Sequence, residues 1–220
     1  MGAPKAIVAA ELDARMKLKR AARRLFAERG FRNVTVREIA AAASQKNHAA
    51  VGYYFGAKEN LAKEILVDGA IVIETRRNAL LDALASRPAP PTVRELVQAI
   101  AMPSAELVTD EPGAEQYFNR FLEDLGANHP DMVLEALEGR WNVGYQRCLA
   151  LLRPLMTDLS LAEKNRRFVF LGAYLGAILA LRETMLADRT RGHPIWRSDG
   201  TLDDIIETAT AILTAPRAVG

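Results

Sequence analysis

The sequence has little cysteine, few aromatic residues and no long uncharged stretch, and each scarcity excludes a class of protein. Because Cys148 is the single cysteine, a disulfide-stapled fold is excluded and a reducing, cytoplasmic compartment is expected. The longest stretch without a charged residue covers 168–181, which is shorter than the ~20 residues of a membrane helix. The apolar run at 6–10 is too short for the core of a signal peptide. We therefore expect no membrane partner.

The sequence also lacks the motifs that carry catalysis or hold metals. Its three histidines, His48, His129 and His193, lie far apart, and no glycine-rich phosphate loop is present. The segment at 129–131, His-Pro-Asp, offers too few ligands for a metal site, and Cys148 lies in an apolar stripe where a thiol is usually inert. We expect neither an enzyme nor a cofactor, with a small all-α enzyme as a remote alternative.

The charges that are present divide unevenly along the 220 residues. Residues 1–60 contain twelve basic and five acidic side chains, whereas the other 160 residues contain 17 basic and 22 acidic ones. A basic first quarter is typical of a nucleic-acid-binding head, because phosphates are neutralised by Lys and Arg. The alternative is that these charges form a solvated helix face. Half of the residues are apolar, which is enough to build a helical core.

Helical periodicity and helix-boundary residues predict an all-α chain. Apolar residues recur at helical spacing over 12–29, and Gly30 follows as a C-terminal glycine. Thr35 and Glu38 have the spacing of a capping box, which predicts a short helix over about 36–43. A polar turn is expected at 44–48, a proline-rich linker at 87–91, a loop at 189–200, and further helices over 48–55, 58–85, 92–108, 113–126, 130–152, 160–187 and 201–214.

Two short helices joined by a polar turn within the basic segment predict a helix-turn-helix motif at about 34–55. In such a motif the second helix lies in the major groove. The surrounding residues follow an ordered pattern of Ala22, Leu25, Phe26, Gly30, Phe31, Val34, Thr35, Val36, Ile39, Ala40, Val51, Tyr53, Tyr54, Phe55, Lys58, Glu59 and Leu61. Over residues 18–66 this pattern resembles the DNA-binding head of the TetR family of bacterial transcriptional regulators. The resemblance implies an N-terminal three-helix head at 1–56 and a ligand-binding and dimerisation body at 57–220.

The chain departs from the family's pattern where the second helix begins. The family usually has a Ser-Xaa-Gly-Thr-Leu run followed by tyrosine, whereas this chain has Asn-His-Ala-Ala-Val at 47–51 followed by Gly52. The turn is also one residue longer, because seven steps separate Ile39 from Lys46. A tyrosine contact to phosphate is therefore absent at position 52, and glycine weakens the short helix by roughly 0.5–1 kcal/mol relative to alanine. We expect the following two tyrosines and the turn to carry more of the DNA contact.

Eight residues in the head or directly after it are expected to contact DNA. Thr35 caps its helix, and the resemblance implies that it also contacts phosphate, while Arg37 can reach the backbone or a base edge. Asn47 can pair bidentately with adenine. Tyr54 and Lys58 are the best phosphate candidates, and Lys58 matches a lysine of the family at the start of the fourth helix. For each residue the alternative is a solvated or capping side chain. The full set is Thr35, Arg37, Lys46, Asn47, His48, Tyr53, Tyr54 and Lys58.

Aromatic residues on the helices near 113–152 suit a pocket for a small, mostly apolar effector. Trp141, Tyr145 and Cys148 lie at i, i+4 and i+7 on one helix face, a spacing that ordinary core packing also uses. The candidate ligand-binding residues are Tyr117, Phe118, Arg120, Phe121, Trp141, Tyr145 and Cys148.

The two C-terminal helices at 160–187 and 201–214 carry more apolar residues than a small domain needs. The resemblance implies that they pair with their copies in a homodimer, and an interior helix of a monomer is the alternative. The expected interface is Phe168, Leu171, Gly172, Leu175, Gly176, Leu179, Ala180, Leu202, Ile205, Ile206, Ala209 and Leu213.

These inferences together predict a DNA-binding regulator that has double-stranded DNA, a second copy of the chain and an unidentified small molecule as partners. We expect a repressor that its effector releases from a palindromic operator. A ligand-independent or activating regulator with the same fold is the alternative.

Overall fold

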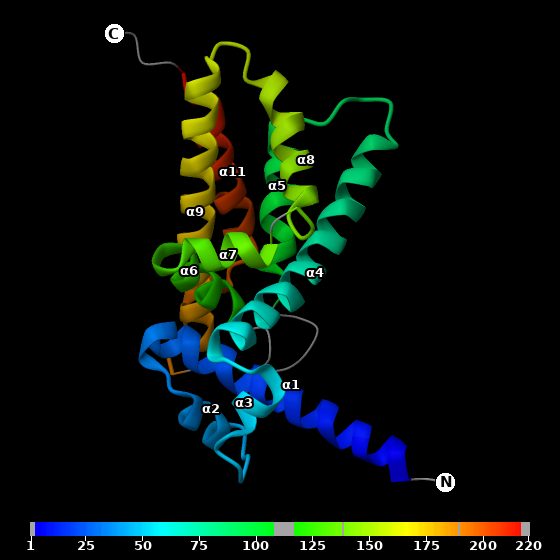
Figure 1. The fold of residues 1–220 in the computed structure, drawn as a ribbon. Helices are drawn as coiled ribbons and strands as arrows, with labels where there is room; N and C mark the ends of the chain where they lie inside the picture. Colours follow the sequence, from blue (N-terminus) through cyan, green and yellow to red (C-terminus); the bar gives the residue numbers. More distant parts are fainter. Residues whose placement is uncertain (1–2, 108–116, 138, 189, 217–220) are drawn as a thin grey trace.

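The structure is a computed structural model, and it describes residues 3–107, 117–137, 139–188 and 190–216 as helices joined by turns and loops (Figure 1). Its elements are α1 (Ala3–Arg29), η1 (Phe31–Asn33), α2 (Val36–Ala42), α3 (Ala50–Phe55), α4 (Lys58–Ala85), α5 (Val93–Ala105), α6 (Phe118–Asn128), α7 (Pro130–Leu137), α8 (Val143–Leu152), η3 (Arg153–Leu155), α9 (Leu161–Ala187), α10 (Pro194–Arg197) and α11 (Thr201–Thr214). The expected all-α fold is confirmed.

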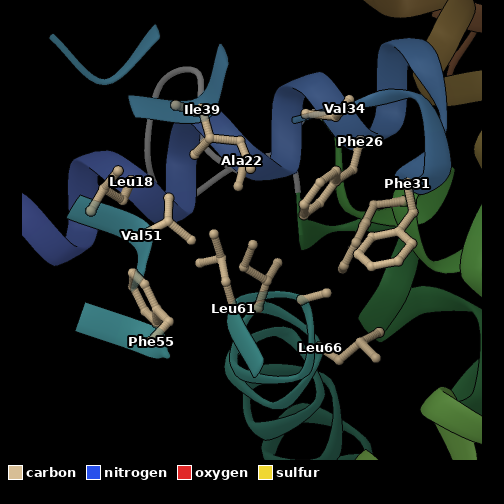
Figure 2. Packing of buried hydrophobic residues seen from close by; sticks show 14 of the residues in the cluster. Leu18, Ala22, Phe26, Phe31, Val34, Ile39, Val51, Phe55, Leu61 and Leu66 are labelled. Atoms are coloured by element: carbon tan, nitrogen blue, oxygen red, sulfur yellow. The ribbon is translucent and has the colours of Figure 1, made fainter. Parts of the chain in front are cut away.

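The head is a small core of apolar side chains from α1, α2, α3 and the start of α4, which converge in Figure 2. Gly30 ends α1 with φ at 79°, a left-handed conformation that glycine adopts without a steric penalty. The predicted capping box of Thr35 and Glu38 is present at the start of α2. The shared core therefore holds the two short helices in a defined orientation against α1.

The body is a bundle in which α9 packs against α6 and α11, while α4 packs against α5, α7 and α8. Figure 1 shows α5, α8, α9 and α11 running side by side away from the head. A second core fills the space between them, and it includes fully buried side chains such as Leu96, Leu152 and Leu171. α4 begins in the head core and continues into this bundle, so it belongs to both halves of the molecule.

A second helix, α6, also joins the body to the head. The Phe121 ring stacks on Phe26 of α1, with the two ring centroids 5.7 Å apart. The Asp124 carboxylate accepts a hydrogen bond of 2.8 Å from the Phe31 backbone N–H. Because Phe121 is fully buried, this contact is part of the head core and not a surface touch.

Several expected boundaries are corrected by the structure. The single helix expected at 130–152 is two helices, because Gly139 takes the left-handed φ of 66° between α7 and α8. The second helix of the motif begins at Ala50, two residues later than expected. The helix expected at 92–108 ends at Ala105, and the one expected at 113–126 is Phe118–Asn128, with 113–116 outside the described residues. A short helix, α10, lies in the expected loop.

Candidate nucleic-acid interface

The start of α2 is fixed by its capping box, and this places Arg37 on the surface. The Thr35 hydroxyl accepts a hydrogen bond from the Glu38 N–H at 3.3 Å, and Glu38 Oε2 accepts one from the Thr35 N–H at 2.8 Å. Hydrogen bonds from Thr35, and then from Arg29, lower the pKa of Glu38 from 4.5 to about 2. The cap therefore stays ionised at neutral pH, and Arg37 extends into solvent from the first turn of α2.

The turn between α2 and α3 exposes its polar residues in a fixed backbone. Ser44 adopts φ of 55°, and the Gln45 N–H bonds to the Ala40 carbonyl at 2.9 Å. The Asn47 side-chain oxygen accepts a hydrogen bond of 2.9 Å from the Ala49 N–H at the start of α3. This bond forms a local turn just before α3, whose N-cap is Ala49, and it uses one of the two lone pairs of the Asn47 oxygen. Lys46 and His48 are exposed on either side of Asn47.

The short helix α3 buries one face and presents the other. Val51 and Phe55 lie in the head core, whereas Gly52 is exposed and Tyr53 is 72% exposed. Tyr54 is half-buried against the core, and its carbonyl accepts a 2.6 Å hydrogen bond from Arg15. The two adjacent tyrosines therefore differ. The Tyr53 side chain is exposed and accessible to DNA, whereas the Tyr54 ring packs in part against the head core.

Lys58 has an internal role that the sequence did not reveal. Its ammonium donates hydrogen bonds of 2.9 Å to the carbonyls of Phe31 and Val34. It also lies 4.3 Å from the centroid of the Phe31 ring. An ammonium has three N–H donors, so one remains for a phosphate. Lys58 therefore ties the start of α4 to the loop before α2, and the expected phosphate contact stays a prediction.

Basic residues of α1 form a wall beside the turn. Lys17, Arg20 and Arg24 line a surface groove of about 450 Å³ together with Ala43 and Ser44. Sequence reasoning noted this basic segment but left these side chains out of the contact set. Their spacing of i, i+3 and i+7 is the signal that places them on one helix face.

The body contains two adjoining hollows, of about 200 and 220 Å³, that share Arg77, Ser104, Leu122 and Tyr145 as lining residues. Three of the expected ligand-binding residues line them, namely Phe118, Trp141 and Tyr145.

The other four candidates lie elsewhere. Arg120 makes an ion pair of 3.4 Å with Glu183 and lies over the Tyr117 ring. Phe121 is stacked on the head, as described above. Cys148 is buried in the core of the body, where desolvation raises its pKa to about 11. These positions were expected in the pocket because helical spacing cannot distinguish a core from a cavity wall.

A buried ion pair on α4 forms part of the cavity wall and was not predicted. Arg77 Nη1 donates to Glu74, and the other guanidinium nitrogens donate to the carbonyls of Ala99 and Ile100 at 3.3 and 3.2 Å. The second oxygen of Glu74 accepts a hydrogen bond from the Gly144 N–H. The pair therefore links α4 to α5 and α8. An Arg and a Glu three residues apart on an otherwise apolar helix face are the sequence signal that was available.

Most residues expected at the dimer interface pack inside the protomer. Phe168, Leu171, Leu175, Leu179, Ala180, Ile205, Ile206, Ala209 and Leu213 are buried, Leu202 and Gly176 are partly buried, and Gly172 is exposed. The large apolar side chains that α9 exposes are different ones: Leu161 is 64% exposed, Val169 67%, Phe170 56% and Leu181 41%. In the described part of the chain, α9 is also the one helix long and apolar enough to cross a membrane by length and composition. Its packing against α6 and α11 is that of a bundle helix.

Comparisons with known proteins agree with the geometry of the head. Residues 18–65 match the model of a family described as bacterial regulatory proteins, tetR family. None of the curated proteins matches the chain. Among solved structures, superantigen PfiT is similar at 18% identity and a TM-score of 0.50, and the match covers 90% of this chain and 95% of PfiT.

Two further structures are similar at lower TM-scores. The TetR family transcriptional regulator PfmR from Thermus thermophilus has 21% identity and a TM-score of 0.47, with 91% of this chain and 99% of PfmR covered. GusR from Salmonella enterica has 17% identity and a TM-score of 0.41, with 91% of this chain and 93% of GusR covered. The likeness to PfiT shows a shared fold alone, and the family match lies within residues 18–65, which include most of the helix-turn-helix head.

Proposed function

We propose that the chain is a homodimeric repressor that binds a palindromic operator and releases it when a small, mostly apolar molecule enters the cavity of the body. The observation that carries this proposal is the exposed surface of the helix-turn-helix. Arg37, Lys46, His48 and Tyr53 extend from α2, the turn and α3 on the outer side of the head core. Cationic and aromatic side chains of this kind contact phosphates and base edges.

The head needs a second copy to recognise a specific operator. One recognition helix covers too few base pairs, and dimers of such motifs bind two half-sites about one helical turn apart. The exposed face of α9 supports the pairing. Ala173 and Ala177 lie between Phe170 and Leu181 on the same face, so small residues alternate with large ones. A continuous apolar face of this kind marks a protein interface.

Release by an effector follows from the elements that form the cavity. Leu122 of α6 and Ala70 of α4 line it, and both helices also reach the head core. A molecule that binds the DNA-free arrangement of α4 and α6 more tightly than the DNA-bound arrangement therefore shifts the position of the head. A coupling free energy of 1–3 kcal/mol lowers operator affinity about 5–150-fold.

The DNA contacts are tested by fluorescence anisotropy with the region upstream of the chain's own gene, measured over a range of salt concentrations. Arg37→Ala and Lys46→Ala are each expected to lower affinity and to reduce the salt slope by about two per dimer, because each removes one phosphate contact per subunit. The melting temperature should not change. Arg87→Ala, two residues beyond the far end of α4, is the matched control and should leave affinity unchanged.

Lys58→Met distinguishes the internal contacts of Lys58 from a DNA contact, because it is expected to lower the melting temperature as well as operator affinity. Unchanged affinity and salt slope for Arg37→Ala and Lys46→Ala would refute the proposed interface. A promoter–reporter assay then separates a repressor, whose deletion raises expression, from an activator, whose deletion lowers it.

The dimer is tested with Phe170→Glu, which places a charge in the exposed face of α9. The variant is expected to have a monomeric mass by light scattering and weak operator binding. Leu134→Glu changes an equally exposed leucine on α7 and should leave the dimer intact. A monomeric wild-type protein that binds the operator at full affinity would contradict the proposal.

A further inference from the structure

The wall of the second hollow carries a carboxylate that takes part in no ion pair among the described residues. Glu123 lies on α6 and faces α9 at Gly176. Its Oε2 lies so close to the Gly176 backbone that a Cβ at residue 176 would displace it. The stripe of small residues on α9 therefore accommodates the carboxylate of Glu123. One turn earlier on α9, Gly172 lies beside Tyr145. A Cβ added at residue 172 would be 3.8 Å from the Tyr145 hydroxyl.

The other charged side chain in the lining of the second hollow is already balanced. Arg77 is neutralised by Glu74, and its Nε and Nη2 each donate a hydrogen bond to a backbone carbonyl of α5. Glu183 is paired with Arg120 and also accepts hydrogen bonds of 2.9 and 3.2 Å from the Asn119 and Arg120 backbone N–H groups. The cavity wall consequently carries a net negative charge, which is that of the Glu123 carboxylate.

The rest of the lining is largely apolar. Leu122, Leu175 and Leu179 line the same hollow as Glu123, and the adjoining hollow shares Tyr145 and reaches Trp141. A partly desolvated carboxylate is stabilised by a cation or a hydrogen-bond donor, and a second carboxylate beside it is strongly disfavoured. The lining thus combines one carboxylate with a largely apolar surface.

We propose that this cavity selects a cationic effector, in which a protonated amine is carried on an apolar or aromatic body. The ammonium binds the Glu123 carboxylate, and the hydrocarbon portion lies along the leucines toward Trp141. This inference rests on the proposed function, since it names the class of molecule that the regulator senses. Charge at Glu123 is the specificity determinant, whereas Arg77 supports the wall.

Three probes with the same carbon skeleton test the proposal: 4-phenylbutylamine, 4-phenylbutanol and 4-phenylbutanoate at pH 7. Binding is followed by quenching of tryptophan fluorescence in a Trp196→Phe background, which leaves Trp141 as the single tryptophan. The amine is expected to bind about tenfold more tightly than the alcohol, and the alcohol more tightly than the carboxylate, as expected for a charge pair at an effective dielectric constant of about 20 after desolvation.

Glu123→Gln should bring the affinity for the amine to that for the alcohol without changing the affinity for the alcohol. The matched control Glu28→Gln removes an exposed carboxylate of α1 and should preserve the order of the probes. Gly176→Ala retains the carboxylate but displaces it, so it should also weaken the amine preference. Circular dichroism establishes that each variant is folded.

Equal affinity for the three probes, or tightest binding of the carboxylate, would overturn the inference. An amine preference that persists in Glu123→Gln would overturn it too. Anisotropy on the same preparation separates the two proposals. Operator binding without amine binding refutes the cationic effector alone, whereas amine binding without operator binding refutes the proposed repressor alone.

Discussion

Replacing Arg77 with methionine tests whether the buried ion pair holds the cavity wall together. The substitution leaves Glu74, which is 6% exposed, without its cationic partner, and it removes the hydrogen bonds to the Ala99 and Ile100 carbonyls. Breaking one partner of a buried pair costs about 3–5 kcal/mol, because a charge remains out of water and uncompensated. A chain of this size loses roughly 2–4 °C of melting temperature per kcal/mol, so a decrease of about 6–20 °C is expected.

Urea unfolding followed by circular dichroism measures the free energy of unfolding, and an unchanged m value establishes that the unfolding transition is comparable. The double variant Arg77→Met/Glu74→Gln removes both charges, so its loss should be smaller than the sum of the two single losses. Arg147→Met is the control. It removes a 2.7 Å pair with Asp82 that is largely exposed and should cost at most about 1 kcal/mol. Equal losses for Arg77→Met and Arg147→Met, or strict additivity in the double variant, would refute the reasoning.

Three further predictions concern single sites. Cys148, with a pKa of about 11, should react with a disulfide reagent at pH 8 far more slowly in the folded than in the urea-unfolded protein, and equal rates would contradict its burial. Gly52→Ala should raise the free energy of unfolding by about 0.5–1 kcal/mol, because no atom lies within 4 Å of the added Cβ; a loss in urea unfolding would contradict this. The folded pKa of Glu38, about 2, lies below its usual 4.5, so its contribution to stability is present above pH 4.5 and is lost as the pH falls toward 2. Melting curves should therefore show a shallower acid dependence in Glu38→Gln, and identical slopes would exclude this role.

Local signals predicted the head because each of them acts within a few residues. A hydroxyl and a carboxylate three residues apart suffice for the capping box of Thr35 and Glu38, and the structure forms it. Gly30 ends α1 through its own backbone freedom. The long helix expected at 58–85 has those same bounds in the structure. Such features depend on neighbours in sequence, so they need no knowledge of the tertiary fold.

Features that depend on distant partners could not be predicted in the same way. α9 is apolar on nearly all sides, so periodicity alone could not tell the covered Leu171 from the exposed Phe170. Lys58 has the sequence position of a surface cation, but its acceptors are carbonyls of a loop more than twenty residues earlier. Glu123 becomes notable only beside Gly176 of another helix. Each of these assignments requires knowing which helices are neighbours.

The contacts between α6 and the head have an interaction free energy in the range that allosteric coupling uses. A hydrogen bond to a charged group contributes about 1.5–3 kcal/mol, and an aromatic pair adds about 0.5–1.5 kcal/mol beyond its buried area. Asp124 with Phe31 and Phe121 with Phe26 are one contact of each kind. Together they amount to about 2–4.5 kcal/mol, a range that overlaps the 1–3 kcal/mol typical of allosteric coupling. Since Leu122, Glu123 and Asp124 are consecutive, a molecule that moves α6 by binding on its cavity side must also alter the hydrogen bond on its head side. A ligand that moves α6 therefore acts directly on these contacts with the head.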